Sequence, residues 1–142
     1  MSGTGATFAN DLLKLIFQGT TIANVAINAT SSPITDIYAS LHTADPVAGN
    51  QTTNEAAYTG YARVAVARTA GGWTVSTNTV TPVAAITFPI AIAGSETETH
   101  AGLGKSVSGA GELFFCGAIT PSIPVSTGII PSLTTASTLT LT

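Results

Sequence analysis

The chain has 142 residues, only 8% of which are charged, and four Lys and Arg against seven Asp and Glu give a formal net charge of −3. Ordinary soluble domains carry about 25% charged residues. Four basic side chains are too few for binding along a nucleic-acid backbone, which requires several phosphate contacts. No apolar run approaches the roughly 18 residues of a transmembrane helix, and the first residues lack the basic and apolar regions of a secretory signal peptide. We therefore expect neither nucleic acid nor membrane as a partner.

Apolar residues repeat with helical spacing near the N-terminus. The stripe, at i, i+4, i+7 and i+8, consists of Phe8, Leu12, Leu15 and Ile16. Gly19 is a stop signal for such a helix. A helix this apolar must dock on a sheet or on a neighbouring subunit. We predict a helical contact arm over residues 1–19, with these four side chains as candidate interface residues.

After Gly19 the sequence alternates with the period of a β-strand. Hydroxyl residues are abundant, with 25 Thr and 12 Ser making 37 of 142, and β-branched Thr favours strands. The predicted strands are 35–42, 58–68, 73–77, 83–88, 96–103, 112–119, 123–125 and 137–142. Gly and Pro in the last third leave room for short strands only. The expected fold is mainly β: a compact antiparallel β-sandwich or barrel of about seven to nine short strands, formed by residues 20–142 as a single domain, with one N-terminal α-helix.

The residues that carry chemistry are few and scattered. The single cysteine, Cys116, excludes an intrachain disulfide, and its apolar neighbours predict a buried, inert thiol. His42 and His100 lack the spacing of a metal site. Glu96 and Glu98 share a strand face, but we interpret them as surface glutamates rather than as a catalytic pair. We expect no catalytic residues, no metal and no cofactor, and hence no enzyme.

Aromatic residues gather around one predicted strand and the turn after it. They are Tyr58, Tyr61 and Trp73, with Arg63 on the same strand face as Tyr61. Tyr, Trp and Arg are enriched at interface hot spots. An aromatic cluster that completes the core explains the same pattern equally well. These four residues are therefore candidate interface residues, with a core role as the open alternative.

The middle of the chain contains four distinctive strings, LHTADP at 41–46, NE at 54–55, YTGYARVAV at 58–66 and GGW at 71–73. Together these strings resemble a family of small tailed-bacteriophage virion structural proteins, of the head-decoration (cement) or tail-fibre-like kind. Weaker similarity covers DLLK at 11–14, ITFP at 86–89 and THAGLG at 99–104. The resemblance implies a phage structural protein, made in the bacterial host cytoplasm, without catalytic residues.

Two positions in the virion are compatible with this resemblance. A chain of 142 residues without repeats is too short for a fibre shaft. A compact β-domain with an apolar helix suits a capsid decoration protein, so we expect binding to the major capsid protein on the outside of the head. Retention would come from many symmetric contacts, and a homo-oligomer, with a trimer favoured, would match capsid symmetry. The alternative is a small tail-associated or tail-fibre-like protein, an adhesin that binds a receptor and contacts other tail proteins.

Overall fold

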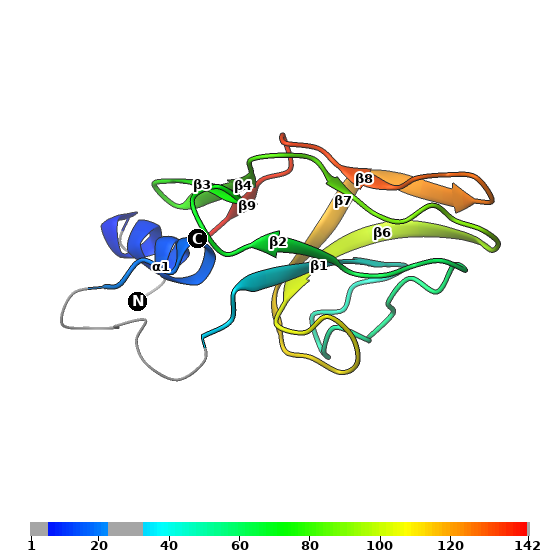
Figure 1. Ribbon diagram of the computed structural model, residues 1–142, viewed down its shortest axis with the longest axis horizontal. Helices are drawn as coiled ribbons and strands as arrows, with labels where there is room; N and C mark the ends of the chain where they lie inside the picture. The colour runs from blue at the N-terminus through cyan, green and yellow to red at the C-terminus, as the bar shows by residue number, and fades with distance from the viewer. Residues whose placement is uncertain (1–5, 23–32, 142) are drawn as a thin grey trace. The chain divides into compact units, whose positions relative to one another are not determined.

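The computed structural model describes residues 6–22 and 33–141 (Figure 1). In chain order the elements are α1 (Ala6–Gln18), β1 (Asp36–His42), β2 (Val64–Ala67), β3 (Trp73–Ser76), β4 (Thr79–Pro82), β5 (Ile86–Thr87), β6 (Ser95–Gly104), β7 (Leu113–Ser126), β8 (Ser132–Leu133) and β9 (Leu139–Thr140). The mainly β class with one helix near the N-terminus is confirmed. Within the described ranges the strands form several antiparallel sheets and no closed barrel.

The chain separates into two compact units. Unit 1 contains Met1–Asp36, Ala67–Ala85 and Leu133–Thr142, and unit 2 contains Ile37–Val66 and Ile86–Ser132. The division at residue 19 that we expect from the sequence stays a prediction. Each unit is built from segments that are distant in sequence. Neither unit therefore corresponds to one continuous stretch that the sequence pattern could indicate.

Unit 1 is organised around the packing of α1 on the sheet of β3, β4 and β9. Phe17 is fully buried and meets Trp73 edge to face, with the ring centroids 4.8 Å apart. Leu13, one helical turn earlier, is fully buried as well. The guanidinium of Arg68 donates hydrogen bonds to the carbonyl oxygens of Leu15 and Ile16. A basic group on the last carbonyls of a helix satisfies them and complements the helix dipole.

Unit 2 contains an antiparallel sheet of four strands in the order β2-β1-β6-β7. β1 is a central strand, and its side chains are buried on both faces. Ile37, Ala39 and Leu41 lie on one face and are fully buried. Ser40 and His42 lie on the other face and are also fully buried, because the loop after β1 hydrogen-bonds to this side of the sheet.

Two differences from the predicted strands have clear physical causes. Residues 58–63 form no strand: Gly60 adopts φ +99°, and the Tyr58 and Tyr61 main chains close a turn with a 3.0 Å hydrogen bond. In the last third, two predicted strands form the single 14-residue strand β7, which runs through Pro121 and Pro124. Proline lacks a donor N–H and is tolerated on an edge strand, which is the position of β7 in the sheet.

Candidate interaction surface

The face of the N-terminal helix that packs in unit 1 lies directly beside the stripe that the spacing indicates. Ala9, Leu13 and Phe17 are buried in unit 1. Leu12, Leu15 and Ile16 are only half-buried. The side chain of Phe8 lies outside the described part of the structure. In the described part of the structure, Leu12, Leu15 and Ile16 therefore keep part of their apolar area exposed.

The aromatic candidates do not form one cluster. Trp73 belongs to unit 1 and is 2% exposed, in contact with Phe17. Tyr58 and Tyr61 belong to unit 2, where their rings meet edge to face at 5.3 Å. Tyr58 and Arg63 are buried, and Tyr61 is half-buried. A contact of these four residues with a partner stays a prediction, and the structure shows that three of them are buried within their own units.

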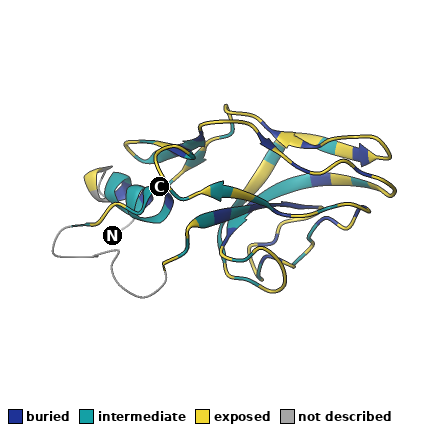
Figure 2. Cartoon of the chain, in the orientation of Figure 1, coloured by how far each residue is buried: buried dark blue, intermediate teal, exposed yellow. Residues whose placement is uncertain are grey.

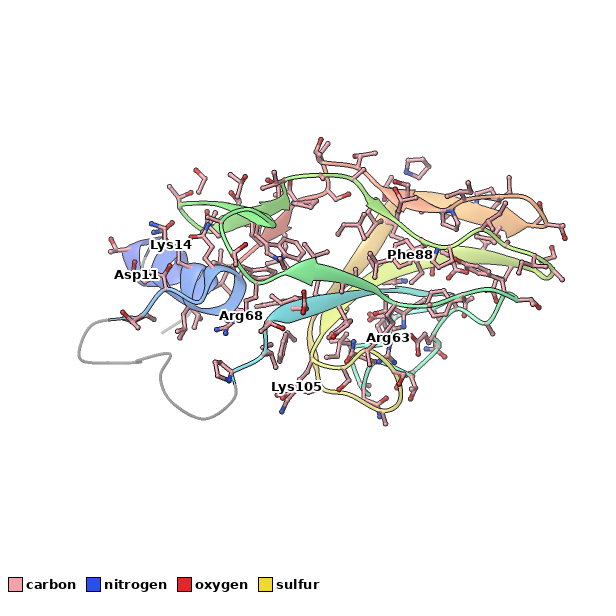
Figure 3. The ribbon with its side chains drawn as sticks, in the orientation of Figure 1. Asp11, Lys14, Arg63, Arg68, Phe88 and Lys105 are labelled. Atoms are coloured by element: carbon pink, nitrogen blue, oxygen red, sulfur yellow. The ribbon has the colours of Figure 1, made fainter. Side chains whose placement is uncertain are left out.

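The buried Arg63, labelled in Figure 3, forms an ion pair with the half-buried Glu55 in unit 2. The Arg63 Nε donates to Glu55 Oε1 at 2.6 Å, and one terminal nitrogen donates to Oε2 at 2.8 Å. The hydroxyl of Tyr61 donates to Glu55 Oε1 at 3.0 Å and accepts the main-chain N–H of Leu41 at 3.1 Å. Burial raises the pKa of Tyr61 far above its ordinary value, so this hydroxyl keeps its proton.

The remaining donors of Arg63 hold the hairpin that joins β6 to β7. They bond the carbonyl oxygens of Ser106 at 2.9 Å and of Gly109 at 2.8 Å. The buried amide of Gln51 supports the same hairpin, because its Oε1 accepts the N–H of Ser106 at 2.9 Å. One network of buried polar groups therefore fixes both the hairpin and the loop after β1.

His42 is part of this support and is not a free imidazole. Its Nδ1 donates to the carbonyl of Thr53 at 2.9 Å, and its Nε2 accepts the hydroxyl of Ser40 at 2.8 Å. Burial lowers the pKa of His42, which favours the neutral ring. Gly102 leaves room for this pair, since a Cβ at that position would lie 2.7 Å from both His42 Nε2 and Ser40 Oγ.

The two strand glutamates differ in a way that the sequence does not indicate. Glu96 accepts the N–H groups of Ala57 and Tyr58 at 2.9 and 2.8 Å. Glu98, expected on the surface, is fully buried, and among the described residues no group lies in hydrogen-bonding geometry to either carboxyl oxygen. Burial, with Glu96 nearby, raises the pKa of Glu98 to about 8. The surface prediction is therefore wrong for Glu98, which is mostly protonated at neutral pH.

Four exposed isoleucines, Ile90, Ile92, Ile129 and Ile130, form what we call the isoleucine patch. They are 48%, 64%, 40% and 55% exposed. The two segments that carry them are joined by main-chain hydrogen bonds, from Ala91 to Ile129 at 2.9 Å and from Gly128 to Ala91 at 2.8 Å. Exposed apolar groups gathered in this way are typical of interaction sites.

The structure also places Cys116 and the residue types that ligate metals. Cys116, expected to be buried, is half-buried, and burial and the Asp45 carboxylate raise the pKa of its thiol. Among residues 6–22 and 33–141, no three His, Cys, Asp or Glu side chains are placed to hold a metal ion. No helix in these ranges has the length and apolarity to span a membrane.

The chain is rich in β-strands, its loops are fixed by hydrogen bonds to buried polar side chains, and it exposes an apolar patch. These are properties of a structural protein that interacts with other proteins. The family described as "Podophage GP4 fiber I protein gp80" matches residues 3–142. The chain belongs to this family, and the resemblance to phage virion structural proteins is confirmed. No curated protein matches the sequence.

Proposed function

We propose that the protein is a non-enzymatic, compact component of a phage fibre, associated with the tail, where it contacts other virion proteins and the host surface. The observation that carries this proposal is the match to a fibre protein family over residues 3–142. The family supports the tail-fibre alternative of the sequence analysis better than the capsid decoration role.

The geometry supports a contact role. The hairpin between β6 and β7 and the loop after β1 are exposed. The buried side chains of Arg63 and Gln51 nevertheless fix the hairpin by hydrogen bonds to its main chain. Ordered loops lose little conformational entropy on binding. We assign these loops to host contact, and the isoleucine patch to contact with a neighbouring virion protein.

One form of the adhesin hypothesis is sugar stacking by Tyr58, Tyr61 and Trp73. Stacking requires an exposed ring face, and Tyr58 and Trp73 are only 3% and 2% exposed. Tyr61 is half-buried, so it is the one ring of the three that keeps exposed area. A host contact would instead use the polar backbone and hydroxyl groups of the loops.

The position in the particle is tested by immunogold labelling of purified virions, combined with the copy number from quantitative mass spectrometry. We expect label at the tail and a copy number in the low tens or below. Labels spread over the head, at hundreds of copies per particle, would overturn the tail assignment.

Capsid decoration is the second candidate. The half-buried apolar stripe of α1, at Leu12, Leu15 and Ile16, is the observation that favours it, because this stripe would suit a clamp on the major capsid protein. The same labelling experiment separates the two positions, and a cryo-electron microscopy map of the head would show the density directly.

A further inference from the structure

We propose that Glu98, in its protonated form, keeps the turn at residues 57–61 fixed against the segment that carries Ile90 and Ile92, and that loss of this proton loosens both. The order of the isoleucine patch then depends on pH. The inference rests on the proposed function only where that function makes this patch a contact with a neighbouring virion protein.

The first observation is the position of Glu98 inside unit 2. The residues of β6 change from exposed to buried and back along the strand (Figure 2), and Glu98 is the first that is fully buried. Among the described residues, no group lies in hydrogen-bonding geometry to either of its carboxyl oxygens. An ionised carboxylate here would have neither water nor a donor to compensate its charge, which is costly. The neutral carboxyl avoids most of this cost.

The titratable groups around Glu98 also favour its neutral form. Burial, together with the Glu96 carboxylate on the same strand, raises the pKa of Glu98 to about 8. Burial, together with both glutamates, raises the pKa of Tyr58 to about 12, so its phenol is neutral. On the neighbouring strand β7, Ile123 lies opposite Glu98, and β7 contains no acidic or basic residue. His100, the next titratable residue along β6, lies beyond a register shift.

The second observation is that Glu96 anchors the start of the turn. Its Oε1 accepts the main-chain N–H groups of Ala57 at 2.9 Å and of Tyr58 at 2.8 Å. Hydrogen bonds to a charged acceptor are roughly twice as strong as those between neutral groups. An ionised Glu98 repels the carboxylate that makes these two bonds, so the turn loses its anchor when Glu98 carries a charge.

The third observation is that the turn is bonded directly to the isoleucine segment. The N–H of Thr59 donates to the carbonyl of Ala93 at 2.9 Å, and the N–H of Ile92 donates to the carbonyl of Thr59 at 2.8 Å. At Gly60, where φ is +99°, the two segments approach so closely that a Cβ would lie 2.7 Å from the carbonyl oxygen of Ile90. A movement of the turn therefore displaces Ile90 and Ile92 as well.

The direction of the effect follows from proton linkage. In a loosened turn Glu98 regains its ordinary pKa of 4.5, whereas the closed turn raises that pKa to about 8. Opening therefore releases a proton between these two pH values. The open form is rarest in acid and becomes about tenfold more populated for each pH unit up to 8.

Hydrogen exchange of the full recombinant chain, followed amide by amide by NMR between pH 6.5 and 8, tests this inference. Each rate is divided into the intrinsic rate at the same pH, which gives a protection factor. We expect the protection of the Tyr58, Thr59 and Ile92 amides to fall by about tenfold per pH unit. The internal control is the amide of Ser106, which bonds Gln51 in the same unit. Its hairpin exchanges through a local opening of its own, so its protection should not follow this trend.

Two substitutions on the same strand face form a matched pair. Glu98→Gln has the shape of the protonated carboxyl and cannot ionise, so the protection of the three amides should be constant across this pH range. Glu96→Gln weakens the anchor itself, so the Ala57 and Tyr58 amides should be less protected at every pH. The wild-type profile needs no substitution, and the test therefore stands even where a variant is unstable.

Three results would overturn the inference. They are wild-type protection that does not change with pH, an equal fall at Ser106, which would mean that the chain opens as a whole, and an undiminished pH dependence in Glu98→Gln. All three are measured on the isolated chain, and none bears on the labelling of the virion. Failure of the pH-dependent turn and failure of the fibre assignment are therefore distinguishable.

Discussion

Glu55 is the only carboxylate that hydrogen-bonds the buried Arg63 guanidinium in the described structure. We expect Glu55→Ala to lower the free energy of unfolding by about 3–5 kcal/mol, because removing one partner of a buried pair leaves the other charge uncompensated. Urea denaturation followed by fluorescence measures this. The exposed Lys105 supplies the control, since Lys105→Ala should change stability by no more than about 0.5 kcal/mol.

Trp73 allows a test of the core interpretation at a single residue. The side chain is buried against Phe17, and its indole N–H has no hydrogen-bond partner among residues 6–22 and 33–141. We expect Trp73→Ala to cost about 3–5 kcal/mol of stability. Trp73→Phe should cost much less, because it keeps the ring contact and removes the unpaired donor. Calorimetric melting of both variants checks this, and equal effects would contradict the role assigned to the ring.

At the scale of the element, α1 has two apolar faces with different roles. Leu13 is fully buried in unit 1, while Leu12 is half-buried. We expect Leu13→Ala to cost about 2–5 kcal/mol and Leu12→Ala clearly less. Denaturation curves of the two variants give the comparison. If the Leu12 variant also incorporates poorly into virions at unchanged stability, the half-buried stripe is an assembly contact.

Some features of the helix and the strands can be predicted from the sequence pattern, and others cannot. The helix near the N-terminus and the alternation of β1 are local properties, and the pattern predicts both. The face of α1 that packs depends on where β3 and its Trp73 lie, which helical spacing does not contain. Likewise, the prolines of β7 suggest interruptions, and only its place at the sheet edge explains why the strand continues through them.

The buried polar groups of the site were the hardest to predict. Arg63 and Tyr61 could be selected by residue type, but their partner Glu55 lies in a loop that the sequence marks only as polar. Glu98 and Glu96 are equivalent in the strand pattern, and a register shift between Glu98 and His100 disturbs the pairing beside them. Burial of one glutamate and not the other depends on long-range packing.

At the scale of the whole molecule, Glu98 makes stability depend on pH. Its pKa is raised from 4.5 to about 8 in the folded state, so between these two pH values the folded chain binds more protons than the unfolded chain. Stability is therefore full at acid pH and falls as pH rises toward 8, with a slope of at most about 1.4 kcal/mol per pH unit. His42, whose folded pKa is lowered, acts in the opposite sense and only below its unfolded pKa of about 6.5.

Denaturation measured between pH 6.5 and 8 separates the effect of Glu98 on stability from that of His42. We expect the wild type to lose stability across this window and Glu98→Gln to stay level, since the amide mimics the protonated carboxyl. Glu96→Gln is a contrast, because it weakens the acceptor of the Ala57 and Tyr58 amides and should lower stability at every pH. A wild-type profile that is flat in the window would contradict the burial of a protonated Glu98.

The way Arg63 holds the β6–β7 hairpin has a consequence for how this sequence can change. Arg63 donates hydrogen bonds to main-chain carbonyls, those of Ser106 and Gly109. The other residues of the hairpin tip are exposed, namely Val107, Ser108 and Ala110. Any residue with a compatible backbone offers the same carbonyls. The side chains at the tip can therefore differ from one relative to the next while the main-chain conformation of the hairpin stays the same, as in an antibody loop on its scaffold.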